Sequence, residues 1–150
     1  MWDVSTGRLL RGFAVDGQDP SGWPYFKWSH DEQYIARCTP GASISVYEVP
    51  SMRLLDNKSI KIEDVKDFFW SPKDNIIAYW SPESDNSPAR VTCMEIPSRN
   101  IIRTKNLFNV TNVALFSFFS LQKEDLVYLS LCFKRPPSLG NRMATFWPAD

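Results

Sequence analysis

A short stretch of this chain occurs three times, and that repetition constrains the fold more than any other feature of the sequence. EVPSMRLL, from Glu48 to Leu55, returns 47 residues later as EIPSRNII, which begins at Glu95. WDVSTGRLL, at the start of the chain, aligns with both stretches at successive spacings of 45 and 47 residues. Self-similarity at a period of this length indicates one supersecondary unit that is stacked several times.

A second shared piece lies between these stretches. FKWSHDEQYIAR, which contains Trp28, matches FFWSPKDNIIAY, which contains Trp70, 42 residues further on. In each copy Trp-Ser is followed by polar, turn-forming residues and then by a short apolar run. This order is typical of a strand, a tight turn and a second strand. We therefore expect Trp28 and Trp70 to occupy equivalent positions in successive sheets.

Four short strands in every 42 to 47 residues, with a Trp-Asp dipeptide at Trp2, are typical of propeller blades of the WD-repeat kind. The predicted fold is all-β, a WD-repeat-like β-propeller fragment of about two to three four-stranded blades. We expect a partial propeller over 1–113, made of a blade tail over 1–14, a blade over 23–57 and a blade over 66–105. An ordinary β-sandwich is the alternative, but it gives no reason for a repeat at this period.

The composition is that of a folded domain without a dominant charge. The 150 residues are 43% hydrophobic and 23% charged, with 17 basic and 17 acidic side chains. A net charge of zero argues against a protein that chiefly coats nucleic acid, although it leaves room for a local basic surface. The chain starts without a signal-peptide pattern, and its apolar runs are too short to cross a bilayer, so we expect a cytoplasmic protein without membrane contact.

The sequence offers few parts for catalysis or metal binding. Its one histidine, His30, lies between Ser29 and Asp31, but adjacent residues of a tight turn cannot align a hydroxyl, an imidazole and a carboxylate as a triad requires. It contains no nucleophile elbow, glycine-rich phosphate loop or His-x-x-x-His motif. Three widely spaced cysteines suggest neither a disulfide framework nor a zinc site. We predict a protein that is not an enzyme and takes no cofactor, metal or small-molecule substrate.

One basic cluster stands out, formed by Arg99, Arg103 and Lys105 in PSRNIIRTKNLFNV. We expect it on the outer strand of a blade and the connection after that strand. Basic side chains on an exposed edge strand discourage pairing with other chains, which is one interpretation of the cluster. The other is a contact with RNA or a partner protein, because Arg and Lys can neutralise phosphates without reading sequence. Lys58, Lys61 and Lys66 form a looser basic set. For this set, the interpretation that basic side chains discourage pairing with other chains is favoured more strongly.

Several longer strings are more specific than a generic blade. GWPYFKWSHDEQYIAR, YEVPSMRLLDNKSIKI, DFFWSPKDNIIAYWSPE and PARVTCMEIPSRNIIRTKNLFNV closely resemble the propeller of the b subunits of eukaryotic translation initiation factor three, from Trp2 to about Val113. The resemblance implies a non-enzymatic scaffold subunit of a translation initiation complex. The partners that it implies are other initiation factor subunits and the small ribosomal subunit, with ribosomal RNA or mRNA as RNA contacts.

Two rival functions stay open at this point. The propellers of serine peptidases of the prolyl-oligopeptidase kind also contain Trp-Ser-Pro-x-x-x-x-Ile-Ala runs, and there the propeller gates a separate catalytic domain. The third interpretation is a generic WD-repeat adaptor of unrelated complexes.

The resemblance ends after Val113, and 114–150 forms a divergent tail. The pattern from Phe119 to Leu129 still imitates the opening hairpin of a blade. Our hypothesis for this tail is a mis-spliced or frame-shifted continuation, because its Phe- and Leu-rich start suits translated noncoding sequence. Sequencing the transcript tests the hypothesis. A spliced message that encodes 114–150 in the frame of the preceding residues, with no alternative junction, would rule it out.

Overall fold

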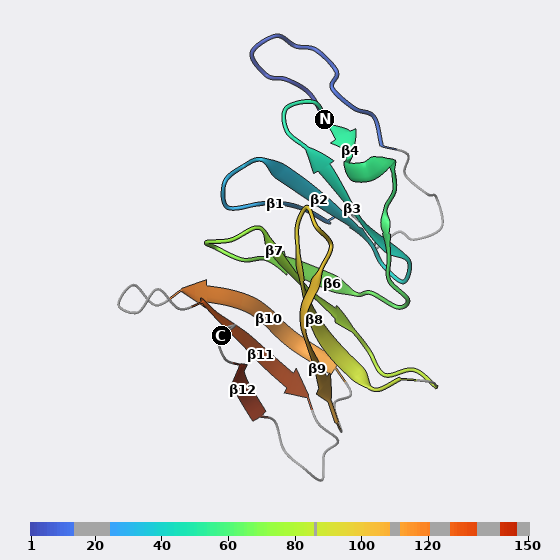
Figure 1. Cartoon of the computed structure of the whole chain (residues 1–150), viewed down its shortest axis with the longest axis vertical. Helices are drawn as coiled ribbons and strands as arrows, with labels where there is room; N and C mark the ends of the chain where they lie inside the picture. Colours follow the sequence, from blue (N-terminus) through green and yellow to red (C-terminus); the bar gives the residue numbers. More distant parts are fainter. Residues whose placement is uncertain (14–24, 86, 109–111, 121–126, 135–141, 147–150) are drawn as a thin grey trace.

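The computed structural model describes residues 1–13, 25–85, 87–108, 112–120, 127–134 and 142–146, and the strands among them form three antiparallel sheets stacked along the molecule (Figure 1). The first sheet has the strand order β1-β2-β3-β4, with β5 also paired to β3. The second sheet has the order β6-β7-β8-β9, and the third has the order β10-β11-β12. The predicted all-β fold class, a partial propeller, is confirmed, although among the described residues the first sheet has five strands and the third has three.

The elements have the following bounds. The first sheet contains β1 (Tyr25–Trp28), β2 (Tyr34–Thr39), β3 (Ser43–Glu48), β4 (Arg53–Leu54) and β5 (Ile60–Lys61), with the 3-10 helix η1 (Leu55–Asn57) between the last two. The second contains β6 (Asp67–Trp70), β7 (Ile76–Ser81), β8 (Ala89–Glu95) and β9 (Ile101–Leu107). The third contains β10 (Asn112–Ser120), β11 (Val127–Lys134) and β12 (Arg142–Phe146). No helix among the described residues is long and apolar enough to span a bilayer.

The first two sheets open with the same hairpin in the same register. Trp28 ends β1 opposite Ile35 of β2, and Trp70 ends β6 opposite Ile77 of β7. In both turns the backbone N–H of the serine that follows the tryptophan donates to the carbonyl oxygen five residues later. The expected equivalence of the two tryptophans in successive sheets is confirmed.

The three copies of the repeated stretch form turns that are closed by the same backbone hydrogen bond. In each copy a backbone N–H donates to the carbonyl oxygen four residues earlier, at 2.7 to 2.8 Å. The donors are Gly7, Met52 and Arg99, and all three have left-handed backbone, with φ of 68°, 54° and 62°. Only Gly7 is free of the steric penalty that a Cβ atom brings to this conformation. The turn is therefore specified by the repeat as a whole and not by a glycine at one position.

The main core lies between the facing sides of the first and second sheets. Because side chains alternate along a strand, one side of each sheet contributes every second residue to this core. Its buried apolar members from the first sheet and its connection are Ala36, Cys38, Ile44, Val46, Leu55, Ile62 and Val65, and those from the second sheet are Phe68, Trp70, Ile77, Tyr79, Met94 and Ile96.

The other side of the first sheet packs against the N-terminal segment. Phe13 makes edge-to-face contacts with Phe26 and Tyr47, with ring centroids 4.9 and 5.4 Å apart. The guanidinium of Arg11 lies over the Tyr47 ring at 4.7 Å and donates a hydrogen bond to the carbonyl oxygen of Met52. Both sides of the first sheet are therefore in contact with a neighbouring copy of the repeat.

Candidate functional site

The outer edge of the second sheet carries two of the three predicted contact residues. β9 pairs with β8 and is the last strand of its sheet in the described part of the chain. Arg103 pairs with Cys93 and Lys105 pairs with Val91, so the two basic side chains leave the strand on the same side. Both residues are exposed. The fold thus presents two cations, two positions apart, on the rim of the second sheet.

Arg99 occupies a different place from the one expected, because it lies in the turn before β9. Its Nη2 donates to the carbonyl oxygens of Leu55 and Lys58, each at 2.9 Å. Its Nε lies 3.2 Å from Oδ2 of Asp56, an ion pair without hydrogen-bond geometry, and its side chain is only 18% exposed. Arg99 therefore binds the second sheet to η1 of the first sheet.

The looser basic set lies on the segment that connects the first two sheets. Lys58 follows η1, Lys61 is in β5, and Lys66 precedes β6. All three residues are exposed. They share the charge of the β9 pair but not its position on a long outer strand, which makes them useful controls.

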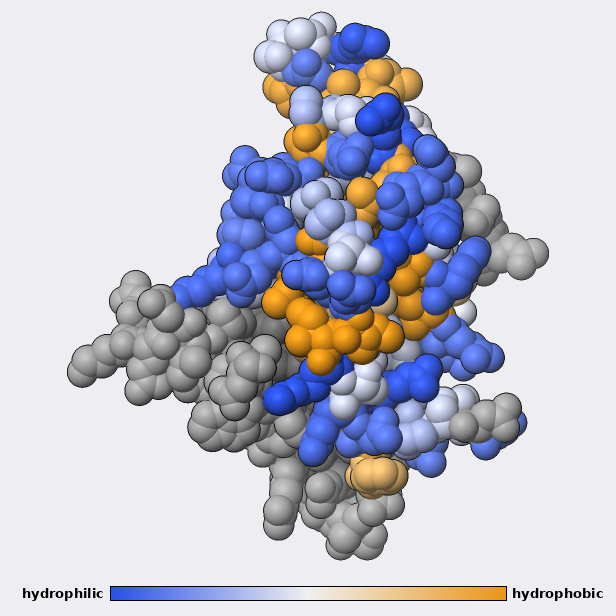
Figure 2. Space-filling model, in the orientation of Figure 1, coloured by the Kyte–Doolittle hydropathy of each residue, from blue (hydrophilic) through white to orange (hydrophobic). Residues whose placement is uncertain are grey.

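Exposed apolar side chains flank the two cations of β9, and they were not among the residues predicted from the sequence. Ile101 is 60% exposed, Ile102 is 43% exposed, and Phe108, directly after the strand, is 69% exposed. Ile102 falls at a register shift between β8 and β9, where Ile101 pairs with Met94 and the next pair begins at Arg103. Figure 2 shows hydrophobic residues among hydrophilic ones over the part of this face where Figure 1 draws β8 and β9. An apolar run in a strand usually indicates burial, so no local pattern signalled this exposure.

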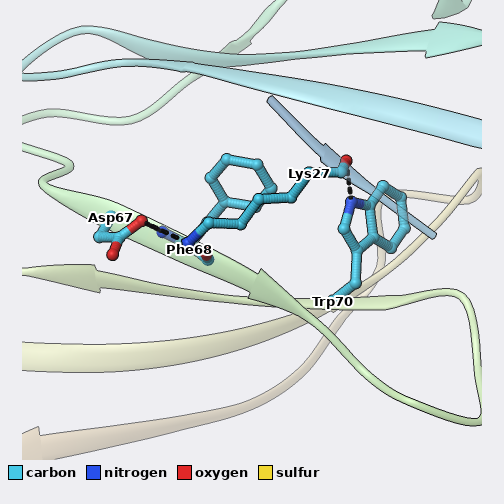
Figure 3. Close-up of polar contacts among 4 residues, drawn as sticks. All are labelled: Lys27, Asp67, Phe68 and Trp70. Atoms are coloured by element: carbon cyan, nitrogen blue, oxygen red, sulfur yellow. Dashed lines mark hydrogen bonds and ion pairs between the residues drawn. The ribbon is translucent and has the colours of Figure 1, made fainter. Parts of the chain in front are cut away.

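The first and second sheets exchange hydrogen bonds where β1 approaches β6 (Figure 3). Nζ of Lys27 donates to Oδ1 of Asp67 at 2.8 Å and to the carbonyl oxygen of Phe68 at 2.6 Å. In return, Nε1 of Trp70 donates to the carbonyl oxygen of Lys27 at 2.8 Å. The ammonium group also lies 3.4 Å from the centre of the Phe69 ring, which is a cation–π contact. These contacts join the first sheet to the second, and the polar groups of Lys27, Asp67 and Trp70 that take part are satisfied within the interface.

The geometry around His30 does not form a catalytic triad. Oγ of Ser29 donates directly to Oδ1 of Asp31 at 2.7 Å, with no imidazole between the hydroxyl and the carboxylate. Burial raises the pKa of the Cys38 thiol to about 11 and also raises the pKa of Cys93, against the lowering effect of Arg103. Neither thiol is therefore poised as a nucleophile at neutral pH. Among the described residues, no group of three or more His, Cys, Asp or Glu side chains could hold a metal ion.

Comparison with known proteins identifies curated relatives, although no family model matches the chain. The chain is 50% identical over 142 residues to the B subunit of eukaryotic translation initiation factor 3 of Mycosarcoma maydis, and 48% identical over 133 residues to that of Schizosaccharomyces pombe. It is 52% identical over 115 residues to the B subunit of Xenopus laevis. Each match covers 77% of this chain but only 16 to 19% of the relative, so the chain spans less than a fifth of the length of these proteins.

A solved structure shares the fold. The chain resembles a crystal structure of a eukaryotic initiation factor with a TM-score of 0.72 at 22% identity, over 97% of this chain and 34% of that chain. The sequence matches confirm the resemblance to the B subunit that the longer strings indicated. The structural match supports the fold.

Proposed function

We propose that this chain, which is similar over 77% of its length to part of the B subunit of eukaryotic translation initiation factor 3, serves as a non-enzymatic scaffold in translation initiation. Its partners in this proposal are other subunits of the initiation factor and the small ribosomal subunit, and its place is the cytoplasm. The observation that carries the proposal is the identity of 48 to 52% to B-subunit proteins from two fungi and a frog.

The architecture suits a scaffold. Stacked sheets that bury their faces against one another present their outer strands and turns at the surface, where partners can contact them. The peptidase alternative rests on the Trp-Ser-Pro-x-x-x-x-Ile-Ala run alone, whereas the similarity to the B subunit extends over most of the chain.

Affinity purification tests the proposal. The tagged protein is expressed in its own cells, captured under gentle conditions and analysed by mass spectrometry, with the tag alone as a control. We expect initiation factor subunits and proteins of the small ribosomal subunit in the eluate. Recovery of a peptidase, or of complexes unrelated to translation, would contradict the proposal.

Sedimentation of the same extract separates two parts of the proposal. A scaffold of an initiation complex should migrate in part with the small ribosomal subunit, and that fraction should fall with added salt if ionic contacts contribute. If the protein co-purifies with initiation factor subunits but never migrates with the small ribosomal subunit, the proposed contacts with the other subunits are supported and the proposed ribosomal contact is contradicted.

A further inference from the structure

We propose that the outer edge of β9 is a docking strand for an extended, acidic protein segment that pairs with it backbone to backbone. This inference goes beyond the scaffold role, because it names one surface and the chemistry of the segment that binds there. It does not depend on the translation role, because it concerns only the edge of the second sheet.

The two sheets end in very different edges. β4, at the edge of the first sheet, has two residues and leads directly into η1, which Arg99 holds in place. β9 has seven residues, of which Ile101 to Asn106 are exposed. A strand edge presents backbone N–H and C=O groups that can pair with an added strand, and an extended peptide uses them in β-strand addition. Of the two edges, only that of β9 is long enough for such a ladder.

The charges on β9 favour an acidic occupant. Arg103 and Lys105 leave the strand on the same side, and the side chains of an added strand also alternate with a period of two. Carboxylates at alternate positions of the added strand would therefore lie beside both cations, where opposite charges stabilise the pairing. A second copy of β9 would place like charges beside each other. The same two side chains thus disfavour self-association and favour an acidic segment.

The exposed apolar residues favour a protein segment over RNA. Ile101 and Ile102 lie at one end of the strand and Phe108 follows the other end, with exposed fractions of 60%, 43% and 69%. Apolar side chains of a bound segment could cover them, which removes apolar surface from water. A phosphate backbone would contact the two cations and leave the backbone edge and both isoleucines unused.

Fluorescence anisotropy with defined probes tests the charge requirement on the whole chain. The probes are an acetylated peptide of alternating Glu and Val, the same peptide with Lys in place of Glu, and single-stranded oligouridine. We expect the acidic peptide to bind and the basic peptide not to bind. The double variant Arg103→Glu/Lys105→Glu should weaken binding about tenfold or more, because two attractive pairs become repulsive.

A matched control and a second variant make the anisotropy test of the charge requirement conclusive. Lys58→Glu/Lys61→Glu makes the same change of charge away from β9 and should leave the affinity unchanged. Circular dichroism checks that every variant is folded. If the charge-reversed protein does not fold, Arg103→Gln/Lys105→Gln takes its place, with a smaller expected loss.

The requirement for backbone pairing is tested with methylated probes. In an extended strand the N–H groups of alternate residues point to the same edge, so one acidic peptide is N-methylated at its Glu residues and another at its Val residues. Because an added strand can run parallel or antiparallel to β9, a third acidic peptide carries both sets of methyl groups, and strand addition predicts that this peptide does not bind. Binding of the peptide that carries both sets of methyl groups, or no binding of the unmethylated acidic peptide, would overturn the proposal. Oligouridine binding that is lost in the Arg103→Glu/Lys105→Glu variant, without peptide binding, would assign the surface to RNA instead.

Discussion

Trp28 and Trp70 hold the same place in the repeat, yet 49% of Trp28 is exposed and only 8% of Trp70. Trp70 stacks on Tyr34 of the first sheet, with ring centroids 6.3 Å apart, and donates its indole N–H to the Lys27 carbonyl oxygen. Trp28 pairs with Ile35, on the side of the first sheet that packs on the N-terminal segment, and about half of its surface lies in solvent. The repeat determines where each tryptophan points, and the neighbouring sheet determines how much it can stabilise the fold.

The largest effect should come from truncating the two tryptophans in parallel. Trp70→Ala removes a buried aromatic side chain and its hydrogen bond, and we expect the free energy of unfolding to fall by about 3–5 kcal/mol. Trp28→Ala removes a half-exposed side chain and should cost about 1 kcal/mol. Urea denaturation of the two variants and the parent measures the difference. Equal losses would show that position in the repeat outweighs the neighbouring sheet.

A second prediction concerns Lys27, whose equivalent position in the second sheet is Phe69. Lys27→Met removes both hydrogen bonds of the ammonium group, to Asp67 and to the Phe68 carbonyl oxygen, and keeps an apolar side chain of similar length. We expect a loss of about 2 kcal/mol in the free energy of unfolding, since the side chains of this ion pair are 25% and 42% exposed and partly screened. Lys61→Met, at an exposed position, is the control and should change stability by less than about 0.5 kcal/mol. A Lys27→Met protein as stable as the parent would show that β1 and β6 are joined by apolar packing alone.

The sequence predicted those parts of the fold that depend on local patterns. Short apolar runs and the turn residues after Trp28 and Trp70 specify hairpins within about ten residues, so their equivalence was visible in the repeat. The left-handed turn was visible only at Gly7, since Met52 and Arg99 carry no signal for that conformation.

The candidate site could be predicted less well from local sequence patterns. Whether Arg99 or Arg103 presents its charge to solvent depends on where η1 lies, and η1 is more than 40 residues away from both in sequence. The exposure of Ile101 and Ile102 likewise depends on β9 being the last strand of its sheet in the described part of the chain, because the same residues in a central strand would be covered. Composition and spacing cannot distinguish these cases, since both are results of packing between segments far apart in the chain.

A third prediction compares Met52 and Arg99, which form the same turn in the two sheets. Arg99→Met places the residue of the first sheet into the second and removes the contacts with the carbonyl oxygens of Leu55 and Lys58 and with Asp56. We expect a loss of about 1 kcal/mol in the free energy of unfolding, because these are charge-assisted contacts near the surface. Arg103→Met changes the same kind of charge on β9 and should leave stability nearly unchanged. If both variants lose the same free energy, Arg99 does not join the two sheets in solution.

The smallest effect should appear at the turn after β1, where Asp31 occupies the position that Lys73 has in the second sheet. Nδ2 of Asn75 donates to Oδ2 of Asp31 at 2.7 Å and so joins the two turns. Partial burial raises the pKa of Asp31, but hydrogen bonds from Asn75 and Ser29 outweigh it and lower that pKa from 3.8 to about 2. Because the folded-state pKa is the lower one, ionised Asp31 stabilises the protein above about pH 4, and this contribution is lost as the pH falls from about 4 to about 2.

Asp31→Asn isolates that contribution, because an amide cannot titrate over this range. The variant should be less stable than the parent at pH 6, and the difference should shrink as the pH approaches 2, since the parent then loses the same ionised contact. Urea denaturation at pH 6, 4 and 2.5 measures the difference, with Glu63→Gln, an exposed carboxylate in a turn, as the control. A difference between Asp31→Asn and the parent that is the same at every pH would mean that the bond from Asn75 does not favour the ionised carboxylate. The contact between the two turns would then not depend on the charge of Asp31. Lys73, at the equivalent position of the second sheet, would in that case replace the acid without the loss of a pH-dependent contact.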